Sequence, residues 1–426
     1  MARANGEHGH GVDPAKLRAW WAHRQWLDGA RVGSSGGSAH DPSADGSAHD
    51  PSAAAGPSAA EVLAATGWAR SVGGAAPYLG LFARAGLGRA AVDAAVARLE
   101  VHELPAARGC TYVVPAEDFA LALAVGAAAP EGEAAAAARH LAVTRDEVEQ
   151  LCLAVDRALA EAGKPLDPAA LRAATGEAVR QLGEAGRKRG LSTTLPLALG
   201  LMQSRGQLRR VPVNGRLDQQ RYGYARWDQP VAGGAADLAR RYFGWAGPAS
   251  LKHFRWFSGF GAATARQAVA EAGAVPVAPG SELLLLPELA EEFADFTVPA
   301  EPYYTLLAGI DGIHLLHRDL ARLVDPADAA RPLPAGRAGR SFGTEADPQT
   351  HIVLDRGRIV GFWEYDTERA EIVHLSFVPP NAELRAAVAR TEAFVRDELG
   401  DARGFSLDSP SSRAPKIAAL RASSGR

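Results

Sequence analysis

Apolar residues recur at helical spacing over most of the chain, and short strand-like runs interrupt this pattern at intervals. The first predicted helix begins at Pro14 and carries Trp20 and Trp21 on its apolar face. From residue 57 onward, three helix-sized segments precede two strand-like runs, residues 101–106 and 110–114. Three helices followed by a two-stranded hairpin is the order of elements in a winged helix.

The same order of elements recurs twice more. In the second copy a helix is predicted over residues 195–204, and a turn at Asn214-Gly215 separates two strand-like runs. The sequence therefore predicts a mainly α, α+β fold, with tandem winged-helix repeats and a C-terminal β-rich α+β domain. The expected divisions are 1–56 for an N-terminal helix plus a disordered insert, 57–143, 144–230 and 231–300 for three winged helices, and 301–426 for the C-terminal domain.

A low-complexity insert follows the first helix. GSAHDPSAD at residues 37–45 is repeated almost unchanged as GSAHDPSAA at residues 46–54. Such small and polar residues cannot bury a core, so we predict a disordered loop. Its histidines, His40 and His49, do not make a convincing metal site, and no metal or other cofactor is expected.

Composition places the chain among soluble globular proteins, with 47% hydrophobic and 22% charged residues in 426. No long uncharged apolar run predicts a membrane span, and the N-terminus lacks the apolar core of a secretory signal, so a cytoplasmic protein is expected. Cys110 and Cys152 lie in apolar surroundings and are interpreted as buried small residues rather than as a disulfide or zinc ligands.

Basic residues concentrate in residues 186–227, although the whole chain has a formal net charge of −3. A local cationic block on a near-neutral protein is typical of phosphate binding, and double-stranded DNA is the expected partner of a monomer. The alternative is a solvated, arginine-rich surface hairpin. The candidate DNA contacts in this block are Lys188, Arg189, Arg205, Arg209, Arg210, Arg216, Gln219, Gln220 and Arg221.

Five segments resemble the winged-helix DNA glycosylases typified by AlkZ and YcaQ, which excise bulky alkylated or cross-linked purines. The segments are residues 24–29 (RQWLDG), 108–118 (RGCTYVVPAED), 192–227, 242–259 (YFGWAGPASLKHFRWFSG) and 353–366 (VLDRGRIVGFWEYD). The resemblance implies a tandem array that wraps a duplex, and an N-glycosylase activity in DNA repair or self-resistance to a genotoxin. The alternatives are a DNA-binding or regulatory protein without chemistry and a structural protein that uses winged helices for protein contacts.

The glycosylases of this family carry a Gln-x-Gln or Gln-x-Asp motif after the helix that corresponds to residues 58–66. Here Trp68-Ala69-Arg70 or its neighbours occupy that place, and no Gln, Asp or Glu lies between Glu61 and Asp93. Arg70 is a poor substitute, because a guanidinium opposes a cationic sugar. Whether the chain is an enzyme therefore stays open at this point.

The segment around Gly73-Gly74 has a second interpretation, as a place where the main chain approaches phosphate. Arg70 and Ser71 are then candidate DNA contacts, and Tyr78 is a candidate for stacking on a base. The alternative is an ordinary turn between two helices.

A carboxylate from elsewhere could replace the missing motif. Residues 309–323 resemble a family segment with two Asp residues eight apart, here Asp311 and Asp319, and His314 and His317 lie between them. Asp311, His317 and Asp319 are the candidate catalytic residues, since carboxylates with imidazoles can perform acid–base work. The alternative is a capped helix with a solvated polar face.

Overall fold

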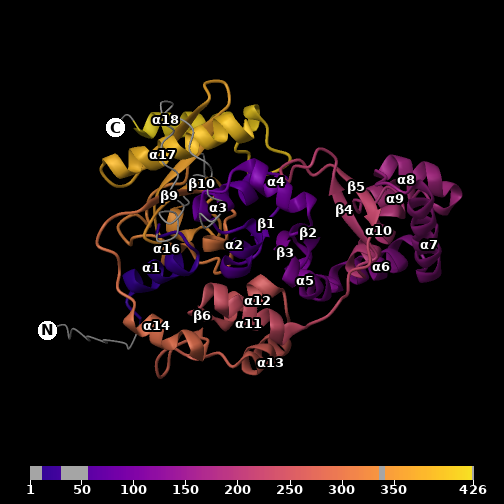
Figure 1. Cartoon of the computed structure of the whole chain (residues 1–426), viewed down its shortest axis with the longest axis horizontal. Coiled ribbons are helices and arrows are strands. Elements are labelled where there is room, and N and C mark those ends of the chain that lie inside the picture. The colour runs from indigo at the N-terminus through magenta and orange to yellow at the C-terminus, as the bar shows by residue number, and fades with distance from the viewer. Residues whose placement is uncertain (1–11, 30–55, 335–340, 425–426) are drawn as a thin grey trace, which may run out of the picture.

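The computed structural model describes residues 12–29, 56–334 and 341–424, and the predicted insert with its two histidines lies outside these ranges. Small antiparallel sheets lie among many helices (Figure 1), which confirms the predicted mainly helical α+β class. The first helix, α1 (Pro14–Arg24), begins where the sequence predicts, because the Asp13 side chain accepts from the N–H of Ala15.

The first winged-helix unit contains a short extra strand that the apolar pattern did not predict. The helix α2 begins with a capping box between Ser58 and Glu61, and the two residues of β1 then join the predicted hairpin in the order β1-β3-β2. The unit consists of α2 (Ala59–Thr66), β1 (Ala69–Arg70), α3 (Ala76–Ala85), α4 (Arg89–Ala97), β2 (Val101–Pro105) and β3 (Thr111–Pro115).

The second unit is a helical lobe at the right of Figure 1. An isolated bridge between Leu166 and Tyr224 takes the place that β1 has in the first unit. The lobe consists of α6 (Ala128–Leu141), α7 (Arg145–Ala162), α8 (Pro168–Thr175), α9 (Gly183–Arg187), α10 (Leu195–Ser204), β4 (Leu208–Pro212) and β5 (Tyr222–Arg226), and α5 (Phe119–Gly126) leads into it.

The third unit repeats the topology of the first, with the sheet order β6-β8-β7. It consists of α11 (Ala235–Ala246), β6 (Ala249–Ser250), α12 (Leu251–Ser258), α13 (Ala262–Ala272), β7 (Val275–Pro276) and β8 (Leu283–Leu285), followed by α14 (Ala290–Asp295).

The C-terminal part is built on a four-stranded antiparallel sheet in the order β12-β11-β10-β9. Its strands are β9 (Tyr304–Leu307), β10 (His351–Asp355), β11 (Arg358–Asp366) and β12 (Glu371–Ser376), and its helices are α15 (Gly312–Leu315), α16 (Leu320–Leu323), α17 (Ala382–Phe394) and α18 (Pro410–Ser424). The C-terminal helix α18 packs against β11 and β12.

The hydrophobic cores cross the divisions expected from the sequence. Tyr78 and Leu79 of the first unit share one core with Trp363 and Phe394 of the C-terminal part. A second core joins the first unit to the third. Ala134 of α6 packs into the core of the second lobe, although residues 57–143 were expected to form the first winged helix. Two of the three winged helices and the C-terminal sheet are thus joined by shared cores.

The helix α10 does not have the exposure that a groove-reading helix needs. Eight of its ten residues are buried, and it packs against α6 and α7. Its side chains instead form the core of the lobe. None of the helices in the described ranges combines the length and apolar character needed to cross a bilayer.

Candidate active site

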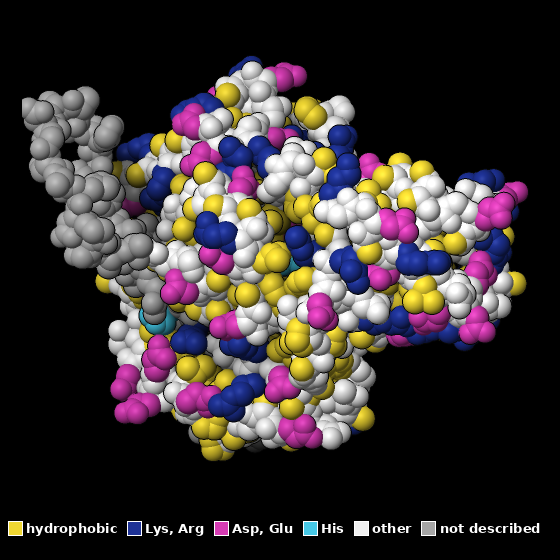
Figure 2. Space-filling model, turned by 45° about the vertical axis from the view of Figure 1, so that its right-hand side comes forward, with side chains coloured by type: hydrophobic (Ala, Val, Ile, Leu, Met, Phe, Trp, Pro, Cys, Tyr) yellow, Lys and Arg dark blue, Asp and Glu magenta, His cyan; other side chains and the backbone are white. Residues whose placement is uncertain are grey.

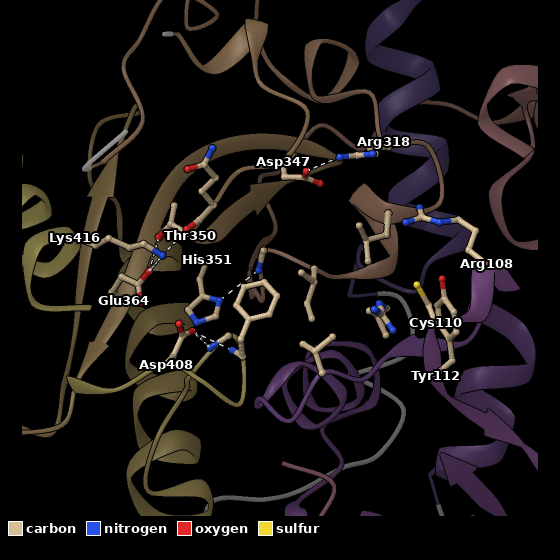
Figure 3. Close-up of a pocket in the computed structure, with 18 of the residues that line it drawn as sticks. Arg108, Cys110, Tyr112, Arg318, Asp347, Thr350, His351, Glu364, Asp408 and Lys416 are labelled. Carbon is tan, nitrogen blue, oxygen red and sulfur yellow. Dashed lines mark hydrogen bonds and ion pairs between the residues drawn. The ribbon is translucent and has the colours of Figure 1, made fainter. Parts of the chain in front are cut away.

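A cavity of about 480 Å³ lies between the first unit, α12 and the C-terminal part. Arg108 and Tyr112 come from the hairpin of the first unit (Figure 3). From the C-terminal part, His351 lies on β10, Glu364 lies on β11, and Thr350 immediately precedes β10. Because side chains from segments far apart in sequence converge here, the cavity depends on the shared cores described above.

The segment that corresponds to the family motif forms part of the cavity wall. Arg70 on β1 donates to the carbonyl of Thr111 at 2.7 Å, and its guanidinium lies 5.5 Å from the ring centroid of Tyr112. The following turn is fixed from the C-terminal side, since the N–H of Ala75 donates to the carbonyl of Arg403 at 2.9 Å. A Cβ at Gly74 would collide with the carbonyl oxygens of residues 403 and 404, which explains the glycine there.

Three non-glycine residues that line this cavity have left-handed backbone conformations. They are Arg108 at φ 59°, Arg318 at φ 48° and Gln349 at φ 56°. Such conformations are uncommon outside glycine, and they concentrate at functional sites, where the surrounding structure holds them in place. Their convergence on one cavity distinguishes it from the other hollows of the surface.

Two guanidinium groups flank one tryptophan at the cavity wall. The guanidinium carbon of Arg108 lies 4.0 Å from the ring centroid of Trp256, and that of Arg318 lies 4.9 Å from it. Arg108 is exposed and has no carboxylate partner among the described residues, so its charge is available to an anionic ligand.

Asp347 presents a half-exposed carboxylate to the same cavity. One oxygen contacts an Arg318 guanidinium nitrogen at 2.8 Å (Figure 3). The other lies 3.2 Å from His314 Nε2, and 45% of the Asp347 side chain is exposed. The hydrogen bond from His314 and the charge of Arg318 hold the pKa of Asp347 well below its usual range. The group is therefore ionised at any physiological pH.

Glu364 is a nearly buried carboxylate in the opposite wall. It lies on the central strand β11, and only 3% of its side chain is exposed. Its Oε1 accepts from the Thr350 hydroxyl at 2.8 Å and lies 3.7 Å from Lys416 Nζ of α18. No described residue donates to its Oε2.

His351 has a structural role beside these groups. Its Nε2 lies 2.6 Å from the carbonyl oxygen of Ala402, and its Nδ1 lies 3.3 Å from the N–H of Gly309. These contacts suit the neutral tautomer with a proton on Nε2, and burial lowers the pKa of His351 accordingly.

The structure places Asp311 in an ion pair with Arg84, while His317 and Asp319 both lie near His253. Asp311 is held by both terminal nitrogens of Arg84, each at 2.8 Å, and it caps α15 by accepting from the N–H of Ile313. Asp319 instead pairs with Arg322 at 3.0 Å and lies 3.7 Å from His253. Asp311 thus lies in a buried ion pair, and its catalytic role stays a prediction.

His317 is buried in the contact between α1 and the third unit. Its ring stacks on Trp21 with centroids 3.9 Å apart, and its Nε2 donates to the carbonyl of Ala246 at 2.9 Å. Burial lowers its pKa to about 3, so the ring is neutral at physiological pH.

This buried histidine predicts acid sensitivity of the fold. The folded pKa of about 3 lies below the unfolded value, so its stabilisation is present above about pH 6.5 and is lost as the pH falls. Between pH 6.5 and pH 5, one such histidine lowers the free energy of unfolding by about 2 kcal/mol. We expect His317→Phe, which retains an aromatic ring against Trp21, to lose less stability between pH 7.5 and 5.0 in urea unfolding. Equal losses in both proteins would contradict this assignment.

Ser71 and Tyr78, both predicted to contact DNA, are buried in this structure. The hydroxyl of Ser71 donates to the Glu103 carboxylate, and the hydroxyl of Tyr78 donates to Asp93 at 2.5 Å. The Tyr78 hydroxyl also accepts from the N–H of Leu217 at 3.0 Å, and its ring lies in the core. Tyr78 is therefore inaccessible to a base in this conformation.

Much of the predicted cationic block is neutralised within the protein. Arg205 pairs with Glu149 at 2.6 Å, and Arg216 pairs with Asp218 at 2.5 Å. On the face shown in Figure 2, basic side chains are interspersed with acidic ones. Lys188 pairs with Glu184, and Arg210 lies against the ring of Tyr222. Burial lowers the pKa of Arg209. The other candidates in the block are exposed: Arg189, Gln219, Gln220 and Arg221.

The described residues hold no group of three or more His, Cys, Asp or Glu side chains placed to bind a metal. Cys152 is buried, and Cys110 is half-buried in the cavity wall.

Comparison with known proteins agrees with this architecture. The family model described as DNA glycosylase AlkZ-like matches residues 69–395. The solved structure of Streptomyces sahachiroi DNA glycosylase AlkZ is similar with a TM-score of 0.64 and 20% sequence identity, over 92% of this chain and 98% of that one. Among curated proteins no sequence matches this chain significantly.

Proposed function

Because this chain belongs to the AlkZ-like DNA glycosylase family, we propose that it excises bulky N7-alkylated or cross-linked purines from duplex DNA. The reaction centre in this proposal is the cavity between the first unit and the C-terminal part. The observation that carries it is the convergence on this cavity of Arg70 from the motif segment, an ionised Asp347 and three residues with left-handed backbone.

The chemistry requires little from the protein beyond electrostatic stabilisation. A purine alkylated at N7 is cationic, so it leaves as a neutral base when the bond between C1′ and N9 breaks and the electron pair moves to N9. The sugar then becomes an oxocarbenium-like cation, and a fixed carboxylate stabilises it until water adds to C1′ and loses a proton. In this proposal Asp347 has that role, since it is ionised and half-exposed.

The test of this activity is release of free base. Purified protein is incubated with duplex DNA carrying N7-methylguanine or an N7-linked cross-link, and the released base is measured by chromatography. We expect release above the spontaneous rate and an abasic site in the strand. Absence of release by a protein that still binds the duplex would overturn the glycosylase proposal.

A non-catalytic DNA-binding protein is the second candidate, and the motif segment favours it. Arg70 occupies the region where the family carries its glutamines, and it lines the same cavity as Asp347, where its positive charge would oppose a sugar cation. This candidate predicts lesion-selective binding with no base release.

Arginines with and without a carboxylate partner should contribute differently to DNA binding. Arg108 lacks a carboxylate partner in the described chain, so Arg108→Gln should reduce the slope of log K against log salt by about 0.9 for one lost phosphate contact. Arg205→Gln is the matched control, because Arg205 is already paired with Glu149.

We expect Arg189 and Arg221 to flank the duplex. We also expect Arg209→Ala/Arg210→Ala to change the salt slope less than Arg108→Gln does. Fluorescence anisotropy at several salt concentrations measures all of these slopes, and an unchanged slope for Arg108→Gln would remove it from the contact surface.

A further inference from the structure

Glu364 occupies an unusual position for a structural carboxylate. It lies in the wall of an open cavity of about 480 Å³, yet only 3% of its side chain is exposed. A buried charge is costly unless its hydrogen-bonding capacity is used. Thr350 and Lys416 use one oxygen, and Oε2 receives no hydrogen bond from any described residue. Oε2 is not one of the fully buried atoms that lack a partner, so it reaches the cavity and can accept from a ligand that donates N–H groups.

The position of this carboxylate is fixed before any ligand arrives. Its backbone is in the centre of the four-stranded sheet, where Glu364 is in register with Val373 of the neighbouring strand. The Thr350 hydroxyl orients Oε1 at 2.8 Å, and Lys416 is itself held by the carbonyl of Gln349 at 2.5 Å (Figure 3). A rigid acceptor of this kind selects ligands by the geometry of their donors.

We propose that this cavity receives the alkylated base itself and that the Glu364 carboxylate accepts from the N1–H and the exocyclic amine of guanine. The inference rests on the proposed function, and it makes guanine the specific substrate base. The base would leave the stack to reach this wall, as bases do in enzymes that act on them.

Guanine is the base whose pairing edge fits a carboxylate best. Its N1–H and N2–H are adjacent donors, and a carboxylate can accept from both. Adenine and cytosine present a donor next to an unprotonated ring nitrogen, which repels the second oxygen. Alkylation at N7 puts a positive charge on the ring and makes N1–H a stronger donor, so the same contact favours the damaged base over the normal one. Phe405, which is 48% exposed and lines the cavity, offers an aromatic face for stacking.

Binding to non-cleavable duplexes tests this inference separately from catalysis. One duplex carries 2′-fluoro-7-methyl-2′-deoxyguanosine, and its partner carries the corresponding inosine analogue, which lacks the exocyclic amine. We expect the wild type to bind the guanine duplex about tenfold more tightly or better, as for loss of a hydrogen bond to a charged group. Glu364→Gln should bind the two duplexes within about threefold of each other, because it lacks the second acceptor. Its affinity for undamaged duplex should not change.

Glu371→Gln is the matched control, since Glu371 lies on β12, pairs with Arg421 at 2.6 Å and is outside the cavity. Should Glu364→Gln fail to fold by circular dichroism, Glu364→Asp retains the charge on a shorter side chain and should also reduce the preference. A wild type without preference between the two duplexes, or a substituted protein that retains it, would overturn the inference. Failure of base release from cleavable DNA with the preference intact would instead reject the proposed reaction and leave the guanine site standing.

Discussion

Replacing Asp347 by asparagine should slow base release by about 100-fold to 1000-fold, the loss expected when one fixed electrostatic group at a transition state is removed. Asparagine has the same shape and can still contact Arg318, but it lacks the charge that opposes the sugar cation. Single-turnover release from N7-methylguanine duplex measures the rate constant, and a gel shift on undamaged duplex should show affinity within about twofold of wild type.

Asp325→Asn is the matched control for this experiment. Asp325 is also a partly exposed carboxylate beside an arginine, at 3.4 Å from Arg358, but it lies outside the cavity. The pKa of Asp347 is held well below its usual range, so Asp347 stays ionised between pH 8 and pH 5. The wild-type rate of base release should therefore not decrease in this range through protonation of Asp347. An unchanged rate of base release in Asp347→Asn would show that the Asp347 carboxylate does not take part in the reaction.

Replacing Arg84 by methionine should destabilise the fold by about 3–5 kcal/mol, the cost of leaving one member of a buried ion pair without its partner. The side chains of Arg84 and Asp311 are only 6% and 5% exposed, and Arg84 also donates to Gln25 at 3.0 Å. Urea unfolding followed by tryptophan fluorescence measures the loss.

The double substitution Arg84→Met/Asp311→Asn should recover part of this loss, because it removes the isolated charge. A single-substitution cost below about 1 kcal/mol, as for an exposed pair, would show that water reaches these groups. This experiment also separates a structural Asp311 from a catalytic one, since the double variant should retain base release.

The elements with strong local signals were predictable from the sequence. The helices that begin at Pro14 and Leu195 depend on residues within a few positions of each other, and they form where expected. The hairpins also follow from local alternation and turn residues. The strand β1 was missed, because two residues carry no periodicity and Ala69 pairs with Val113 far along the chain.

The candidate site was less predictable, because contacts distant in sequence determine it. The arginine block was visible, but its neutralisation was not, since the partner of Arg205 is 56 residues away. Asp347 lies in an irregular segment with no motif, and Glu364 looked like one residue of a strand. Arg108 had a weak signal, in the Arg108-Gly109 turn at the tip of a predicted hairpin. Only the packing of the first unit against the C-terminal sheet makes these residues neighbours.

The contact between residues 72–75 and 403–406 has a consequence for how activity arises during synthesis. The N–H of Ser406 donates to the carbonyl of Val72 at 3.0 Å, and Lys416 supports the Glu364 wall from α18. A growing chain that has not yet passed residue 416 lacks one side of the cavity. Under the proposed function, a ribosome-bound or prematurely terminated chain of this kind is therefore expected not to release a base.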